Sequence, residues 1–352
     1  MKSEGHCRVG SASFFVLCKI IWLAAKKMLL LRLEIILSEN TNHKENQMRQ
    51  IRIVLLALVA AILVGCGTSS TVPITGRKRT LMVSDEQVLS LSNEQYNQYM
   101  QTAKPSTNAA NTAMVKRVGQ NLANAVVSYL NANGLGSEVS QYKWEFNLVQ
   151  DQQVNAFCMP GGKIVVYEGL LPVTQDETSL AIVLGHEIAH AVAKHSAEQM
   201  STAIKQQYGA QALSVLMSGA GASSGLQSVA GTVFGLGAQG ASAKYSRDHE
   251  SEADHLGIIF AAMAGYNPEA AVSFWQRMSQ ATGGGSTSWL STHPSDATRI
   301  KQIQGWLPEA RKYYAAATTA IQTNGKTLHI SNKKNTSKKK NTSKKTNKNK
   351  KK

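Results

Sequence analysis

The second half of the chain carries two short runs of histidines and carboxylates at helical spacing. In the first, His186-Glu187-Ile188-Ala189-His190, the two histidines are four residues apart. On a helix both imidazoles therefore project from one face and can reach a single metal ion. Zinc suits imidazole nitrogen, and a catalytic zinc takes three protein ligands and keeps a position for water. Glu187 is placed to accept the proton of that water, so this run predicts zinc-assisted peptide hydrolysis.

The second run, Glu250-Ser251-Glu252-Ala253-Asp254, supplies a third ligand. Glu250 and Asp254 are four residues apart and share a helix face, whereas Glu252 lies about 200° round from Glu250 and should point elsewhere. We therefore predict Glu250 as the third zinc ligand. Asp254 is predicted to accept a hydrogen bond from a ligand histidine. The alternative is a solvated acidic face, which the upstream histidine run disfavours.

Three further histidines lie near these runs but do not fit the ligand pattern. On one continuous helix, His195 would be about half a turn away from the face that holds His186. It is predicted to be a surface histidine rather than a ligand. His249 and His255 flank the acidic run, and we expect them to be structural or exposed to solvent.

The surrounding sequence indicates the elements that position these residues. The sequence predicts helices over residues 112–131, 178–200, 247–265 and 268–280. Two further segments, 297–306 and 309–322, close the domain. Residues 142–149 and 163–167 read as strands, with a turn at Pro160-Gly161-Gly162. The strand 163–167 is either an edge strand that pairs with substrate main chain or a structural strand. The uncharged residues 206–243 indicate close-packed helices or, alternatively, a membrane-dipping hairpin.

Taken together, these motifs resemble the zinc metallopeptidase family of HtpX and the CAAX prenyl endopeptidase. The matching segments are His186–His190, Ser246-Arg-Asp-His-Glu-Ser-Glu-Ala-Asp254 with Gly257, Asn155-Ala-Phe with Pro160-Gly-Gly and Val165-Val-Tyr-Glu-Gly169, and Thr292-His-Pro-Ser-Asp-Ala-Thr-Arg-Ile300. The resemblance implies a predominantly α-helical α+β fold of the zincin type, with a small β-sheet beside the HExxH helix. It also implies one zinc ion per chain and ATP-independent endopeptidase activity in envelope protein quality control.

The matching segment Thr292–Ile300 contains two further candidate residues, His293 and Arg299. His293 is expected at the active site, either as an extra ligand that blocks the site or as a group that stabilises the oxyanion. The alternative is that it only holds a loop. Arg299 is expected to anchor that loop by ion pairing.

The amino-terminal residues have the layout of an export signal. From Met48 the chain reads as a short basic region, an apolar stretch and a small-residue cleavage site, which predicts a signal peptide over residues 48–65. Leu63-Val64-Gly65-Cys66 resembles the bacterial lipobox, in which the cysteine is acylated. By resemblance to Gram-negative lipoproteins, Gly67 after the cysteine favours the outer membrane over the inner membrane. Residues 1–47 are interpreted as an upstream extension outside the native protein, or alternatively as an unusually long leader.

The remaining organisation follows from composition. Residues 66–80 are expected to form a lipidated tether, residues 81–330 a metallopeptidase domain, and residues 331–352 a Lys-rich disordered tail. The resemblance is to a lipid-anchored periplasmic subgroup, since the transmembrane helices of HtpX-like members are not found. Cys158 has no partner if Cys66 is lipidated, and is interpreted as a small core residue or, alternatively, a redox sensor.

Charge bears on the partners. The formal net charge of +16 lies entirely at the two ends, because residues 66–332 contain 18 basic and 18 acidic side chains. The folded part therefore gives no indication of nucleic-acid binding. The expected partners are unfolded or misfolded protein substrates, the membrane through the lipid anchor, and envelope assembly or chaperone proteins. The competing hypothesis is a catalytically silent or chaperone-like zinc-binding lipoprotein.

Overall fold

The computed structural model describes residues 49–52, 54, 68–208, 224–234, 245–281, 289, 293, 298–320 and 323. The chain divides into two compact units, Met1–Cys66 and Gly67–Lys352. In the first unit the described residues are helical. Within the described part of the chain, no helix combines the length and the apolar character needed to cross a membrane. The expectations for Cys66, for residues 1–47, for the tail 331–352 and for most of 206–243 fall outside the described residues.

The second unit begins with a hairpin where the sequence predicts a tether. Strands β1 (Thr68–Thr71) and β2 (Lys78–Leu81) pair antiparallel. The hairpin is tied to the domain by Arg79, whose buried guanidinium donates to the carbonyl of Val192. A buried charged donor of this kind needs an acceptor, and here the acceptor is the last residue of helix α7. The hairpin is thus part of the folded unit.

Three helices follow the hairpin. Helix α3 (Asp85–Thr102) begins with a capping box in which Ser84 accepts from the amide of Gln87 and the Gln87 side chain accepts from Ser84. Periodicity does not predict this helix, because the stretch is polar; in the structure it buries only Val88, Leu91, Ser92 and Tyr96. Helix α4 spans Ala109–Ala132 and the short α5 spans Gly136–Val139.

The central sheet has three strands in the order β3-β5-β4. Strand β3 (Glu145–Val149) runs parallel to β5 (Lys163–Tyr167), and β4 (Ala156–Met159) runs antiparallel to it. Gly161 and Gly162, both with positive φ, turn the chain from β4 into β5. Because β5 is central and buried at every residue, the interpretation of residues 163–167 as an edge strand is wrong. The edge beside helix α7 is β4.

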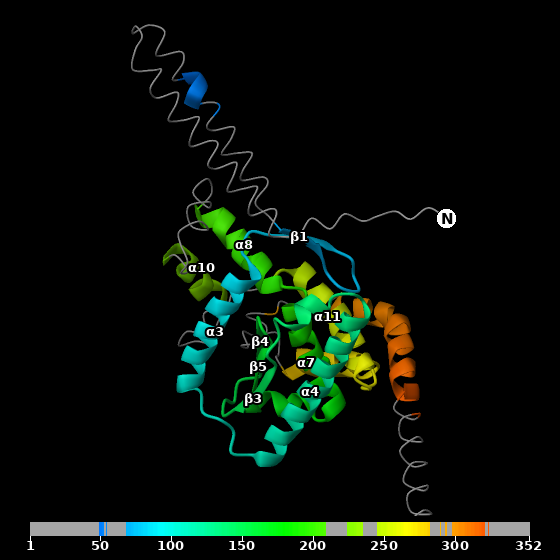
Figure 1. Ribbon diagram of the computed structural model, residues 1–352. Coiled ribbons are helices and arrows are strands. Elements are labelled where there is room, and N and C mark those ends of the chain that lie inside the picture. The colour runs from blue at the N-terminus through cyan, green and yellow to red at the C-terminus, as the bar shows by residue number, and fades with distance from the viewer. Residues whose placement is uncertain are drawn as a thin grey trace, which may run out of the picture. The chain divides into compact units, whose positions relative to one another are not determined.

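Alternation along the strands builds two apolar cores on opposite faces of the sheet. Ile164 and Val166 belong to a core shared with α4 and with the later helices α7, α11 and α12. Val165 and Tyr167 face a second core formed with β2, α3, α8 and α10. Figure 1 shows the sheet between these two helical layers. This arrangement is the α+β, mainly helical fold with small sheets that the sequence predicts.

The second half of the unit is helical. A 3₁₀ turn (Glu168–Leu170) and α6 (Leu171–Thr174) lead into α7 (Glu177–Val192), α8 (His195–Tyr208), α10 (Ser224–Phe234), α11 (Arg247–Met263) and α12 (Ala270–Ala281). The helix predicted over residues 178–200 is therefore two helices. The break is at Lys194, whose φ is 57°, a left-handed conformation that an α-helix cannot continue through.

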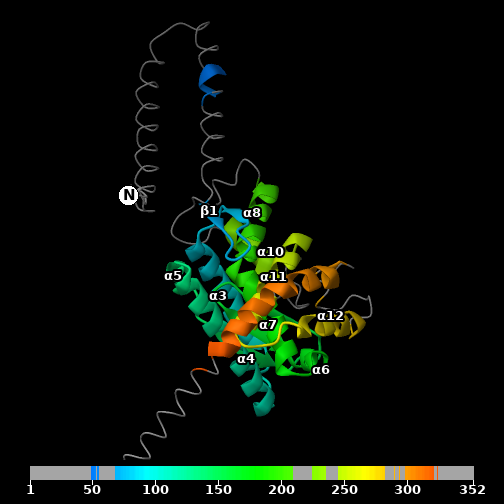
Figure 2. The ribbon, with the colours of Figure 1, turned by 90° about the vertical axis from the view of Figure 1, so that its right-hand side faces the viewer.

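The last described helix covers residues 299–320 without interruption. The sequence analysis divides this stretch into two segments, 297–306 and 309–322. The helix continues because Ile303, Leu307 and Ala310 are all buried along one face. Figure 2 shows this helix, in orange, next to α11. Trp306 stacks on His255 of α11, and Glu309 accepts from the same imidazole.

Candidate metal centre

Helix α7 positions three of the predicted site residues. It begins at Asp176, whose side chain accepts from the amide of Ser179, and every residue from Ser179 to Val192 is buried. The helix is held by apolar packing nearly all round. His186, Glu187 and His190 consequently occupy fixed positions in the interior, with exposed fractions of only 1–2%.

Helix α11 brings the acidic run to α7 through a contact between glycines. A Cβ built on Gly257 would lie 2.6 Å from the amide nitrogen of His186, and one built on Gly185 would lie 2.5 Å from the carbonyl oxygen of Gly257. Any larger residue at either position would push the helix backbones apart. The close approach places Glu250 and Asp254 beside the histidines of α7.

The structure gathers four donor side chains into one group. One ligand atom each from His186, His190, Glu250 and His293 can be chosen so that all lie within 4.8 Å of one another, and all four residues are buried. The Nε2 atoms of His186 and His190 are 3.1 Å apart. Glu250 Oε1 is 3.4 Å from His190 Nε2, and Glu250 Oε2 is 3.6 Å from His186 Nε2. The spacing suits several ligands converging on one cation.

The unpaired atoms of this group fit a metal ion. Among the described residues, Glu187 Oε1 and Glu250 Oε2 are buried and have no hydrogen-bond donor, a costly state for a carboxylate oxygen. His186 donates from Nδ1 to Asp254, so its Nε2 carries a lone pair. Burial lowers the pKa of His190 well below its usual value, which also favours a neutral ring. A cation between these oxygens and nitrogens would satisfy them together.

Glu187 is oriented by the sheet. Its Oε2 accepts the backbone amide of Cys158 on β4 at 3.0 Å, while Oε1 lies 3.5 Å from His293 Nε2. Burial raises the pKa of Glu187, although the nearby histidines His293 and His186 oppose the shift. A buried carboxylate with a raised pKa and a free oxygen is suited to take up a proton.

Asp254 lies behind His186. Its Oδ1 is 2.9 Å from His186 Nδ1 and accepts from Arg299 Nη2 at 2.6 Å. The guanidinium carbon of Arg299 is 3.3 Å from the centre of the Trp275 ring, so the cation is held on an aromatic face. Arg299 thus pairs with the acidic run itself. The predicted hydrogen bond between Asp254 and His186 is present, whereas the metal-ligand roles of His186, His190 and Glu250 remain predictions.

His293 enters the site from another part of the chain. Its Nδ1 lies 3.0 Å from Glu250 Oε1 and 3.4 Å from His186 Nε2, and its ring stacks on Trp289. Burial lowers the pKa of His293, but the carboxylates of Glu250 and Glu187 outweigh this effect and raise it. The structure therefore brings His293 into the donor group.

The interpretation of His195 as a surface histidine is wrong. Its exposed fraction is 0%, and its Nδ1 lies 2.9 Å from Nδ1 of His190. The prediction fails because His186 and His195 do not lie on one continuous helix. The chain turns at Lys194, and His195 begins α8. Glu252 does point away from Glu250, as predicted, but it is also buried and bonds to His195.

Two aromatic residues of the site were missed by sequence reasoning. Tyr245 stacks on His190 with ring centres 4.0 Å apart, and its hydroxyl lies 3.0 Å from Ser196 Oγ. Trp289 stacks on His293 at 4.3 Å. The only available signal for Tyr245 was its position directly before Ser246, the residue that caps α11. Neither contact could be read from spacing along one element.

Cys158 has the environment of a core residue. It is buried, and burial, together with the Glu187 carboxylate, raises the pKa of its thiol well above the usual value. A thiol of this kind stays protonated and unreactive. The environment favours the core interpretation over the redox sensor.

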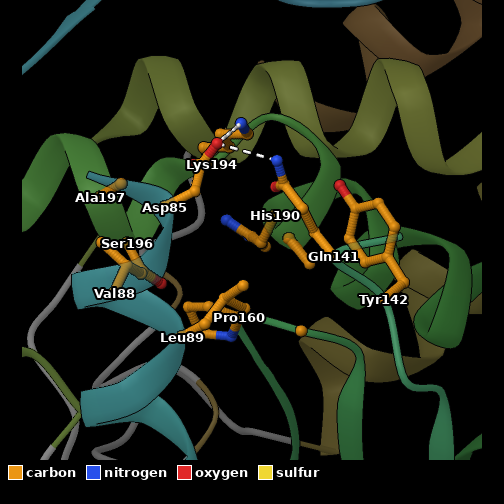
Figure 3. A pocket seen from close by; sticks show the side chains of 12 residues that line it. Asp85, Val88, Leu89, Gln141, Tyr142, Pro160, His190, Lys194, Ser196 and Ala197 are labelled. Carbon is orange, nitrogen blue, oxygen red and sulfur yellow. Dashed lines mark hydrogen bonds and ion pairs between the residues drawn. The ribbon is translucent and has the colours of Figure 1, made fainter. Parts of the chain in front are cut away.

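A small pocket borders His190 on the side of α3 (Figure 3). Its walls include Val88, Leu89 and Pro160. At one side Asp85 accepts from Lys194 Nζ at 2.8 Å and from Gln141 Nε2 at 2.9 Å. The ion pair fixes the left-handed turn between α7 and α8 next to a predicted ligand.

Comparison with known proteins identifies the family. Residues 90–307 match the model of peptidase family M48. The chain belongs to this family. It is 41% identical over 180 residues to mitochondrial metalloendopeptidase OMA1 of Schizosaccharomyces pombe, which covers 50% of each chain. It is 30% identical over 261 residues to OMA1 of Saccharomyces cerevisiae, covering 72% of this chain and 73% of that protein.

A bacterial relative is also similar. The beta-barrel assembly-enhancing protease of Yersinia pestis is 30% identical over 181 residues, covering 50% of this chain and 37% of that protein. The chain thus spans half or less of the length of several relatives. Membership in family M48 confirms the predicted class, a metalloendopeptidase, and with it a metal-dependent site. The identity of the metal and the subgroup of HtpX-like proteins remain proposals.

Proposed function

We propose that the protein is a zinc-dependent endopeptidase that hydrolyses peptide bonds of unfolded or misfolded proteins, with Glu187 as the general base. The observation that carries this proposal is the position of the Glu187 carboxylate. It is buried against the donor group of His186, His190 and Glu250, and one of its oxygens has no hydrogen-bond donor among the described residues. The base and the metal ligands therefore face the same small volume.

In this reaction three residues would hold the metal ion and Glu187 would transfer the proton. Zinc, when bound by His186, His190 and Glu250, supplies a Lewis acid that polarises a peptide carbonyl and lowers the pKa of water. Glu187 takes the proton of the attacking water on Oε1 and then delivers it to the leaving amine. Its Oε2 stays anchored on the amide of Cys158, which keeps the base aimed at the site.

The edge strand β4 offers a place for the substrate main chain. Because β5 pairs with only one side of β4, the other side faces the α7 helix and the site. Because the Cys158 amide on this side is held by Glu187, a peptide added along this edge would pair with the other outward-facing main-chain groups of β4 and run past Glu187. Recognition through the main chain suits an enzyme that acts on unfolded segments of varied sequence.

His293 is proposed to close the site at rest. A catalytic zinc needs one position free of protein ligands, yet His293 lies within the donor group. Its side chain must leave that position before substrate can bind. From a position outside the donor group, the imidazole would donate a hydrogen bond to the developing oxyanion.

The setting is proposed to be a bacterial cell envelope. Leu63-Val64-Gly65-Cys66 supports acylation at Cys66 and anchoring on the outer membrane facing the periplasm, with the inner membrane as the alternative. The name of the Yersinia relative, which refers to beta-barrel assembly, supports an envelope quality-control role. The mitochondrial names of the yeast relatives point to a second setting, the mitochondrion, as the alternative.

The test is cleavage of casein, an unfolded protein, by the purified full chain, together with its zinc content. Glu187→Gln should bind zinc normally and lose about 100- to 10,000-fold in rate. Glu177→Gln, the same change at the half-exposed start of α7, is the matched control and should cleave normally.

His293→Ala separates the remaining outcomes. Cleavage that is faster in His293→Ala than in the wild type would support the closed resting site. If zinc binds but neither protein cleaves any of several unfolded substrates, the endopeptidase proposal is wrong, and a silent zinc-binding lipoprotein takes its place.

A further inference from the structure

A chain of hydrogen bonds, buried at His190 and His195 and partly buried at its far end, leads away from His190 and has no part in the chemistry described above. His190 Nδ1 lies 2.9 Å from His195 Nδ1, and His195 Nε2 lies 3.0 Å from Glu252 Oε2. Glu252 accepts from Arg77 Nε at 2.8 Å and from Thr75 Oγ1 at 2.6 Å. We call this series, from His190 to Arg77, the His195 relay.

Donor and acceptor accounting fixes the direction of the relay. The Glu252 carboxylate only accepts, so His195 Nε2 must carry the proton that it shares with Glu252. A neutral His195 then has a lone pair on Nδ1, and His190 must donate from its own Nδ1. The lone pair of His190 is thereby placed on Nε2, the atom that faces His186 at 3.1 Å.

We propose that His195 is a positioning residue for the metal, which fixes the tautomer and ring orientation of His190 as a ligand. The inference rests on the proposed function, in which His190 binds zinc. Outer hydrogen bonds of this kind set ligand geometry in metal sites generally. Here the outer partner of His190 is a second neutral histidine rather than a carboxylate.

Contacts of two basic residues, Lys194 and Arg77, hold the relay in place. The ion pair of Lys194 with Asp85 fixes the turn that starts α8 at His195. Arg77 of the hairpin also donates two hydrogen bonds to Glu198 on α8, at 2.8 and 2.7 Å. Arg77 thus ties α8 to Glu252 on α11, so His195 is held between the two helices.

A second metal site is the competing explanation for these residues. Ligand atoms of His195, Glu198 and His249 also lie within 4.8 Å of one another. However, both nitrogens of His195 are already used, one toward His190 and one toward Glu252. A metal on His195 would have to break the relay, so the structure assigns these contacts to positioning.

The experiment measures the zinc affinity of the full chain by competition with a chromophoric chelator. His195→Phe removes the acceptor for His190 and should weaken zinc binding about 10- to 100-fold. His195→Gln offers one acceptor and one donor, and should recover most of this loss. His255→Phe, the same change on α11 at a histidine that bonds Glu309, is the control and should bind zinc as the wild type does.

The thermal unfolding of the metal-free proteins is measured alongside. Equal zinc affinity in His195→Phe and wild type, with both proteins folded, would overturn the positioning role while leaving the proposed function intact. A wild type that binds no zinc would instead contradict the proposed function. Two zinc ions per wild-type chain, reduced to one in His249→Phe, would favour the second metal site and overturn the inference.

A measurement on the unmodified protein decides the matter if His195→Phe does not fold. Nitrogen-15 NMR of the histidine rings reports which nitrogen carries the proton. The zinc-loaded wild type should show His195 protonated at Nε2 and His190 protonated at Nδ1. His195 protonated at Nδ1, or at both nitrogens, contradicts the relay.

Discussion

The two histidines of α7 are supported in different ways. His186 donates directly to a carboxylate, Asp254, which sits one helical turn after Glu250 on α11. His190 reaches its carboxylate, Glu252, only through His195. Helix α11 therefore serves both histidines from two of its faces. The carboxylate that supports His186 can be found from i, i+4 spacing along α11 alone. The support of His190 needs His195 of α8, Glu252 of α11 and Arg77 of the hairpin.

The two sides also differ in what lies beyond the carboxylate. Asp254 is paired with Arg299, whose guanidinium is buried against Trp275. Glu252 is paired with Arg77, which is half-exposed on the amino-terminal hairpin. We therefore expect the His186 side to be the more rigid one and the His190 side to be more sensitive to changes at the domain surface.

Removing either His186 or His190 should have the same, largest effect on zinc content, although the two side chains are supported differently. His186→Ala and His190→Ala each delete one of three proposed protein ligands, so each should reduce the zinc content of the purified chain from one ion to near zero. Elemental analysis checks this outcome. If one of the two variants retained one zinc ion per chain, the histidine removed in that variant would not be a ligand.

Asp254→Asn tests the direct support. The amide keeps the shape but loses the charge that orients His186 and pairs with Arg299, so zinc affinity should fall about 10- to 100-fold. Chelator competition measures it. Asp248→Asn, at an exposed position in the first turn of the same helix, is the control. An effect no larger than that of the control would mean that His186 is held by packing alone.

Gly257→Ala strains the helix contact on the His186 side. The added methyl would lie 2.6 Å from the amide nitrogen of His186, and overpacking of this kind costs about 1–3 kcal/mol in the free energy of unfolding. Urea denaturation measures this change. Gly305→Ala, at a helical glycine with nothing within 4 Å, is the control and should stabilise by up to about 1 kcal/mol.

Arg77→Met should give the smallest effect and one that depends on pH. Burial raises the pKa of Glu198, but hydrogen bonds from Arg77 and His249 outweigh it and lower the pKa to about 2. The pKa of Glu252 is also lowered to about 2, since donation by His195, Arg77 and Thr75 outweighs burial.

The sign follows from linkage. These carboxylates stabilise the fold fully above their ordinary pKa of 4.5, and the contribution is lost as pH falls toward 2. Wild type should therefore be more stable than Arg77→Met at pH 7, with the difference shrinking below pH 4.5. Urea titrations over this range check it. A difference that does not change with pH would show that Arg77 acts by packing.

Several elements were predictable because their signals are local. The strand over residues 163–167 and the helices near residues 112–131 and 247–265 follow from hydrophobic periodicity, which depends only on neighbouring residues. The group of His186, Glu187, His190 and Glu250 was likewise found from spacing within two helices. Helix α3 was missed because its stability comes from a capping box and from packing on the second core rather than from a strong apolar face.

The sequence by itself determined the two runs of predicted ligands, because helix geometry turns a spacing of four residues into a shared face. The family and the predominantly helical class with a small sheet followed from the resemblance of the motifs. Only the tertiary structure decided that β4 is the edge strand, that His293 joins the donor group, and that His195 is buried behind His190. The position of His195 depends on a single left-handed residue, Lys194, and all three features depend on contacts between segments far apart in the chain. No regular spacing along one element encodes them.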